Sequence, residues 1–231
     1  MRTNRMMQSK IYRFLDYLLR LILLNALIVI PAFSFFLIYE LIDKEGSYRL
    51  AFLTLIPLIL WLFPSIVAVT DVIKQYETDE TNTIFKDFFK SFGKNYLKSI
   101  IITFILAILI ILLYNSITYF FKNARKDTLH LLCFFLSISI AFVAILIAVQ
   151  IPLVMAYFKK LRIWELLKLS CIMTFKNLGI NILIALMIIG IGAIDITLNY
   201  VMITIGFSVP IYITIKMSFK QYIKIYRKVE E

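Results

Sequence analysis

The chain has 231 residues, of which 61% are apolar and 17% charged, and its formal net charge is +11. A soluble domain carries roughly 45–50% apolar and about 25% charged residues, so the composition excludes an ordinary soluble protein. The apolar residues form long runs, most of them longer than the roughly 18–20 residues that cross ~30 Å of hydrocarbon. We therefore expect an all-α, polytopic membrane helix bundle, because backbone in lipid must satisfy its own hydrogen bonds.

Six transmembrane helices are predicted within a single integral membrane domain, residues 1–231. They lie at about 20–42, 49–73, 97–121, 129–157, 178–194 and 200–219. The last two share one apolar run, Leu178 to Ile215, which as a single helix would be roughly 57 Å long, nearly twice the bilayer core. We expect a tight turn near Asp195 and Asn199 to divide this run.

The basic residues predict how the protein is oriented. With the N-terminus in the cytoplasm, the inner segments hold 20 of the 25 Lys and Arg residues, whereas the outer connections hold five basic and five acidic residues. These inner segments are 1–20, 74–98, 158–177 and 216–231. By the positive-inside rule both termini are cytoplasmic. The basic inner face predicts contact with anionic lipid headgroups, not with nucleic acid.

The second predicted span has one mixed face that combines prolines with polar residues. Its members are Pro57, Trp61, Pro64, Ala68, Asp71 and Gln75, at spacings of three or four. Prolines leave helix carbonyls without partners, and acids within a membrane are often functional. Two interpretations of Asp71 stay open: an interfacial salt bridge with Lys74, or a cation or proton site on a transport path.

Two short amphipathic helices are predicted in the membrane interface, at about 84–92 and 162–175. The first follows the N-cap sequence that ends at Thr83. It places an aromatic face (Phe85, Phe88, Phe89 and Phe92) opposite lysines, and the second contains Trp164. Each helix follows a span with a proline, Pro64 or Pro152. Each is then followed by a Lys-Asn pair, Lys94-Asn95 or Lys176-Asn177. This order predicts a parallel internal repeat.

The fourth predicted span carries a stripe of small residues. They are Ser137, Ala141, Ala144, Ala148, Pro152 and Ala156. Small faces let helices approach closely in lipid, so we expect a packing helix, with a substrate path as the alternative. Asn25, Gln150 and Asn181 lie inside apolar runs and predict hydrogen bonds between helices.

No catalytic or cofactor pattern stands out in the sequence. His130 is the only histidine, so the usual histidine cluster of a metal site is excluded. There is no phosphate-binding glycine loop and no nucleophile–base set. We expect no cofactor, no metal and no enzymatic activity.

The chain resembles the YesL-like family of small bacterial membrane proteins. The resemblance rests on Asn25 and Pro31, on Pro64 to Val69, on Ile84 to Asn95, and on Ile205 to Ser208 ahead of a basic tail. The family usually has Gly-Pro-Ala in the second span, where this chain has Phe63-Pro64-Ser65. The resemblance implies a bacterial cytoplasmic membrane protein of undefined activity, connected with carbohydrate uptake because such genes lie beside uptake genes.

Two functions remain open from the sequence. One is an accessory or permease-like component of carbohydrate uptake, with other membrane or uptake-system proteins as partners. The other is a non-transporting scaffold or regulator, which would act through its small-residue helix faces and basic cytoplasmic face. A ligand-sized polar cavity between the second and fourth spans would favour transport.

Overall fold

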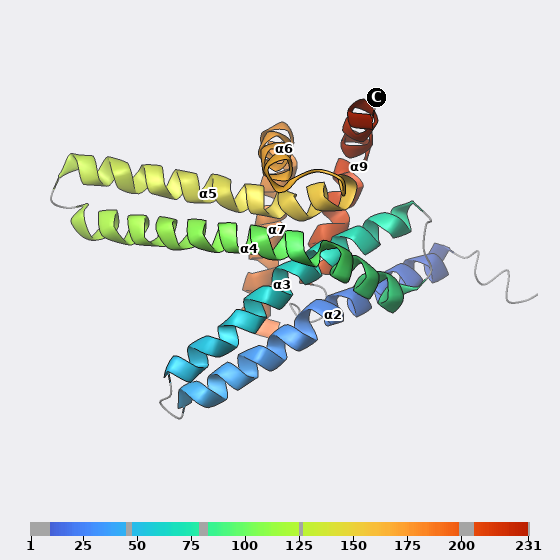
Figure 1. The fold of residues 1–231 in the computed structure, drawn as a ribbon, viewed down its shortest axis with the longest axis horizontal. Coiled ribbons are helices and arrows are strands. Elements are labelled where there is room, and N and C mark those ends of the chain that lie inside the picture. The colour runs from blue at the N-terminus through green and yellow to red at the C-terminus, as the bar shows by residue number, and fades with distance from the viewer. Residues whose placement is uncertain (1–9, 45–47, 79–82, 125–126, 199–205, 231) are drawn as a thin grey trace, which may run out of the picture.

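The computed structural model describes residues 10–44, 48–78, 83–124, 127–198 and 206–230. Every regular element in this part of the chain is a helix (Figure 1). The helices are α2 (Lys10–Lys44), α3 (Tyr48–Glu77), α4 (Ile84–Asn123), α5 (Thr128–Tyr157), α6 (Ile163–Lys176), α7 (Leu178–Leu198) and α9 (Ser208–Glu230). The all-α prediction is therefore confirmed for the described residues.

Two long helical hairpins form the frame of the molecule. Helix α2 packs along α3 and α4 packs along α5, and the two pairs diverge from the region where they meet (Figure 1). Helix α3 contacts α2, α4, α5 and α9, and α5 contacts α3, α4, α6, α7 and α9, so these two helices connect the rest of the bundle. The apolar core lies where the hairpins meet, with Ile28, Val67, Phe88 and Val154 completely buried.

Three described helices are long and apolar enough to cross a membrane: Phe14–Ser34, Ile84–Asn123 and Thr128–Tyr157. A fourth crossing is added if α6 and α7, which meet at a 91° bend, form one broken span. The described helices thus give three or four candidate crossings, fewer than the six predicted. The predicted spans at about 49–73 and 200–219 are not among them, and residues 199–205 lie outside the described residues.

Helix α4 differs from the prediction of a separate interfacial helix at 84–92. It is one uninterrupted helix of 40 residues, about 60 Å long. A buried stripe continues through the expected break, with Ser91, Asn95 and Ser99 one turn apart. Tertiary packing of this stripe keeps the helix continuous, since most helical stability in proteins comes from such a face.

The predicted aromatic face of this segment is also divided in the structure. Phe88 is completely buried, and Phe92 packs against Trp61 of α3 with 4.8 Å between ring centroids. Phe85 and Phe89 are exposed. Only these last two therefore point away from the bundle, as an interfacial helix requires.

Helix α6 is a separate short helix close to the range predicted for it. Its first turn is held by a 2.8 Å hydrogen bond from the backbone N–H of Arg162 to the carboxylate of Glu165. Trp164 is 80% exposed. The chain then bends by 91° into α7, with Asn177 buried at the bend. In the predicted repeat, α4 corresponds to α6 followed by α7. The first is one continuous helix, whereas the second is bent by 91°, so the two halves differ here. The repeat stays a prediction.

Helix α9 begins against a side chain from the other end of the sequence. The Oδ1 atom of Asn25 accepts hydrogen bonds from the backbone N–H groups of Phe207 and Ser208, at 2.9 and 3.1 Å. These N–H groups lie at a helix start, where no intrahelical carbonyl can serve them. Asn25 therefore acts as an N-cap supplied by α2 and connects the first helix with the last.

We expect Asn25→Ala to lower the free energy of unfolding by about 1–2 kcal/mol, the cost of losing a helix cap. Thermal unfolding of the purified chain in one detergent measures the change. Ser34→Ala is the matched control, because the Ser34 hydroxyl is exposed and donates only to the Ile30 carbonyl of its own helix. Equal unfolding temperatures for the two variants would contradict the capping role.

Candidate functional site

Asp71 is the centre of a buried ionic cluster. It is 1% exposed, and its two carboxylate oxygens lie 2.7 and 2.8 Å from the Nζ atom of Lys159. The hydroxyl of Ser91 donates a third contact at 2.7 Å, and Asn95 donates to the Ser91 hydroxyl and carbonyl. The structure thus gives Asp71 an ion-pair partner, Lys159, that lies 88 residues away in the sequence.

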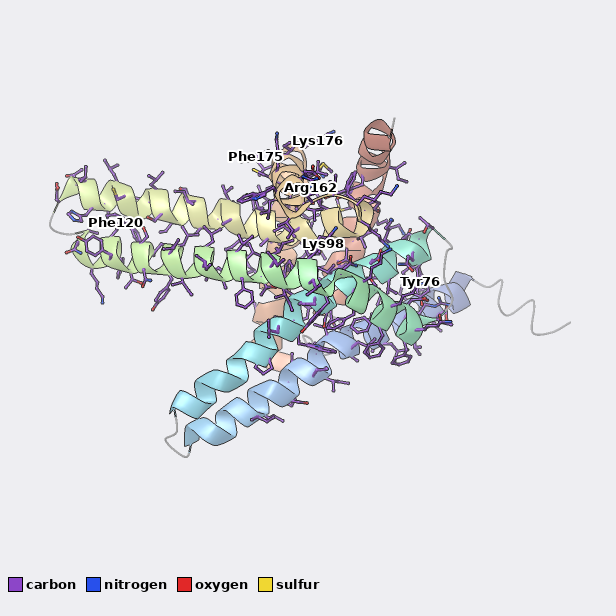
Figure 2. All side chains as sticks on the ribbon, viewed as in Figure 1. Tyr76, Lys98, Phe120, Arg162, Phe175 and Lys176 are labelled. Carbon is purple, nitrogen blue, oxygen red and sulfur yellow. The ribbon has the colours of Figure 1, made fainter. Side chains whose placement is uncertain are left out.

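Two further lysines hold the C-terminal end of α5. The ammonium of Lys98 donates to the carbonyls of Lys159 and Leu161 at 2.9 and 3.0 Å, where α4 passes this end (Figure 2). Lys74 donates to the carbonyl of Ala156 at 3.2 Å. Helix C-terminal carbonyls lack intrahelical partners and carry partial negative charge, so cations bind there. These lysines join α3 and α4 to the end of α5.

The rest of the mixed face of α3 is mostly packed. Pro64 and Ala68 are buried, whereas Pro57, Trp61 and Gln75 are half-buried. The face therefore lies against α4 and α5 around Asp71, and its one carboxylate is compensated by an ammonium group.

A second buried polar network joins α5, α6, α7 and α9. Gln150 donates to Asn181 and accepts from the hydroxyl of Tyr222, and Asn181 donates to the Thr174 carbonyl at 3.1 Å. Burial raises the pKa of the Tyr222 hydroxyl above its ordinary value, so this hydroxyl stays protonated and can donate. The predicted hydrogen bonds between helices are confirmed for Gln150 and Asn181, as for Asn25.

The small-residue stripe of α5 makes one close contact and then borders cavities. Near its start, the hydroxyls of Ser137 and Ser116 of α4 lie 2.9 Å apart. Ala144 lines a cavity of about 430 Å³ beside α4. Ala148 and Pro152 line a second one, of about 310 Å³, whereas Ala141 is half-exposed and lines neither. The last member of the stripe, Ala156, is completely buried.

The 310 Å³ cavity lies between α3 and α5, bordered also by α4, α7 and α9. Nearly all of its lining side chains are apolar. Its two hydroxyls, on Thr70 and Thr214, donate to carbonyls of their own helices at 2.7 and 2.6 Å. A cavity thus lies between the second and fourth predicted spans. Its lining presents no converging polar groups of the kind that orient a sugar.

The described residues hold no cluster of three or more His, Cys, Asp or Glu side chains that could bind a metal ion. Cys133 and Cys171 are both free thiols. The polar chemistry that the structure does bring together is that of the Asp71 cluster and the Gln150 network.

Residues 21–117 match the family model described as "Protein of unknown function, DUF624". The match covers somewhat less than half of the chain, and it is consistent with the resemblance to YesL-like proteins. It contains Asp71, Ser91 and Asn95, whereas Lys159 lies beyond it. Comparisons with curated proteins and with solved structures found no match.

Sequence reasoning missed Lys159, Ser91, Lys98 and Tyr222. One signal for the ion pair was present, because Asp71 follows Pro64 by seven residues and Lys159 follows Pro152 by seven. Aligning the two halves of the predicted repeat would have placed the two charges at equivalent positions. The stripe of Ser91, Asn95 and Ser99 was also visible as polar residues one turn apart.

Proposed function

We propose that this chain is a non-transporting scaffold or accessory subunit of the bacterial cytoplasmic membrane. It has six spans, cytoplasmic termini and an interfacial α6, and it carries no enzymatic activity. The observation that carries the proposal is that the buried polar side chains of the Asp71 cluster and the Gln150 network bond mainly to one another. Such groups hold helices together in lipid.

The two cavities also favour a scaffold or accessory subunit over a carrier or an enzyme. A carrier of a polar solute needs converging polar groups in a concave site, and both cavities are lined almost entirely by apolar side chains. An enzyme would need at least two titratable groups converging on a reacting atom. The carboxylate of Asp71 instead faces an ammonium and a hydroxyl that compensate its charge.

Partner proteins and anionic headgroups are the proposed contacts. On α6, Trp164 and Phe175 are exposed, as are the basic residues Lys168 and Lys176. Figure 2 labels Phe175 and Lys176. Exposed aromatics next to cations suit a membrane interface or a membrane-protein partner. The connection with carbohydrate uptake rests on the family resemblance alone, and within it we favour an accessory role over a permease.

Transport is tested with proteoliposomes that contain only this chain. We expect no uptake of a panel of radiolabelled monosaccharides and disaccharides above that of protein-free vesicles, with or without a proton or sodium gradient. Correct folding in the same vesicles is checked by protease protection. Saturable uptake of any one sugar would overturn the scaffold proposal.

The orientation is tested with a phosphatase reporter that is active only outside the cytoplasm. Fusions that end after Lys44, Ala124 and Leu198, the last residues before the predicted outer turns or within them, should be active. Fusions that end after Thr78 and Arg162 should be inactive. Activity at an inner position, or its absence at an outer one, would refute the six-span topology.

A further inference from the structure

One exposed face of α4 changes from basic to apolar along its length. Its members follow one another at spacings of three or four residues, so they share one side of the helix. All of them are exposed, and in chain order they are Lys86, Lys90, Lys94, Leu97, Ile101, Phe104 and Ile108. Helix α4 is long and apolar enough to cross a membrane, and its apolar part suits contact with lipid. The change between Lys94 and Leu97 therefore marks the level at which the hydrocarbon core meets the headgroups.

Two aromatic side chains lie beside the three lysines of this face. Phe85 and Phe89 are each 55% exposed, and they precede Lys86 and Lys90 by one residue. The exposed surface of these turns thus has a basic strip and an aromatic strip next to each other. Exposed rings beside cations are typical of a helix held at a membrane interface. This basic–aromatic surface consists of Phe85, Lys86, Phe89, Lys90 and Lys94.

The basic–aromatic surface carries a net positive charge. Asp87 is the one acidic residue in the sequence from 84 to 97. Its side chain is half-buried, and its carboxylate accepts a hydrogen bond from the hydroxyl of Thr83 at 3.0 Å. None of the three lysines takes part in a salt bridge within the part of the chain that the structure describes. Their charges therefore act on whatever lies next to this surface.

Basic side chains from a distant segment adjoin this surface. Lys98 lies one turn after Lys94, and its ammonium donates to two carbonyls in the connection between α5 and α6, at 2.9 and 3.0 Å. This connection adds two exposed basic side chains, those of Lys160 and Arg162. The acidic residue that follows them, Glu165, already accepts a hydrogen bond from the backbone N–H of Arg162. The fold thus brings basic residues of two segments to one region of the molecule.

We propose that the basic–aromatic surface binds anionic phospholipid headgroups of the cytoplasmic leaflet. The lipid phosphates lie at the three lysines, and the rings of Phe85 and Phe89 lie among the first segments of the acyl chains. An acidic protein offers the same charges, but the two exposed rings and the apolar continuation of the face favour lipid. The inference rests on the cytoplasmic placement of the start of α4 in the proposed function, and it extends the headgroup contact proposed for α6 to a defined site on α4.

The test uses the full chain in phosphatidylcholine nanodiscs that contain a trace of a photoactivatable lipid. Two probes share one acyl chain, with the photoactivatable group close to the headgroup, and differ only in having a phosphatidylglycerol or a phosphatidylcholine headgroup. We expect the phosphatidylglycerol probe to label residues 84–97 at least fivefold more than the phosphatidylcholine probe, as measured by mass spectrometry of peptides. Equal labelling by the two probes would overturn the proposal and favour a protein partner for this surface.

Substitutions separate the charges from the rings. Lys86→Gln/Lys90→Gln/Lys94→Gln should reduce the preference for phosphatidylglycerol to within twofold. Lys86→Arg/Lys90→Arg/Lys94→Arg is the matched control, which keeps the charges and should keep the preference. Phe85→Ser/Phe89→Ser should lower labelling of residues 84–97 by both probes at least threefold. A full preference in the glutamine variant, or unchanged labelling in the serine variant, would overturn the proposal.

Salt gives the same test on the wild type if the glutamine variant does not fold. Raising NaCl from about 0.01 M to about 1 M shortens the screening length from about 30 Å to about 3 Å. The preference for phosphatidylglycerol should then fall at least threefold, and an unchanged preference would overturn the proposal. Both leaflets of a nanodisc have the same composition, so these readouts do not depend on orientation. The reporter fusions and the sugar-uptake assay therefore test the proposed function separately.

Discussion

Lys159→Gln is expected to lower the free energy of unfolding by about 2–4 kcal/mol, because it leaves the buried Asp71 carboxylate without its ammonium partner. The value lies toward the lower end for a buried ion pair, since the Lys159 side chain is 30% exposed. Asp71→Asn should cost less, about 1–2 kcal/mol, because the remaining lysine can extend its ammonium toward water. The measurement is unfolding by SDS titration in mixed micelles.

The double variant Asp71→Asn/Lys159→Gln tests whether the two side chains stabilise the fold through their direct interaction. An asparagine still offers an acceptor to the Ser91 hydroxyl, and neither side chain carries a charge. We expect its stability to lie closer to the wild type than that of Lys159→Gln. Lys94→Gln, at an exposed position of α4, is the matched control and should change stability by less than about 0.5 kcal/mol. Additive losses in the double variant would contradict direct coupling of the two residues.

Tyr222→Ala should be the most damaging single change in α9, with an expected loss of about 3–5 kcal/mol. The side chain is completely buried, stacks on Tyr157 and donates to Gln150. Its removal leaves a cavity and an unpartnered amide oxygen between α5 and α9. The loss should appear both as a lower unfolding temperature and as faster proteolysis of the C-terminal helix.

Tyr222→Phe distinguishes the ring from the hydroxyl. It keeps the stacked ring and removes one hydrogen bond, so about 1–2 kcal/mol should be lost. Met217→Ala is the control on the same helix, because Met217 is exposed. If Tyr222→Ala and Met217→Ala behaved alike, Tyr222 would not hold α9 against the bundle.

The helices themselves could be predicted because apolar run length and composition are properties of short sequence windows. The boundaries of α5 and α6 agree with the predicted segments to within one or two residues. The continuity of α4 could not be predicted in this way. Phe92-Gly93-Lys94 suggests a break locally, but the buried stripe through Ser91 and Asn95 keeps the helix intact by contacts with other helices.

The site was harder to predict than the fold. Asp71 was recognised as an unusual acid, yet its partner lies 88 residues away, and local spacing pointed to Lys74. Asn25, Gln150 and Asn181 were expected to bond between helices, and they do so. Their partners could not be named, because a partner depends on how helices α2, α5, α7 and α9 cross in space.

The central claim is that the Asp71–Lys159 pair holds helices together and does not bind or move a solute. Complementation of a deletion strain by the Asp71→Asn/Lys159→Gln variant tests this most directly, with protein level and unfolding temperature measured in parallel. We predict that the variant accumulates normally and restores the deletion phenotype as fully as the wild type. A variant that is folded and abundant but fails to complement would contradict the claim, because the charges themselves would then be needed for function.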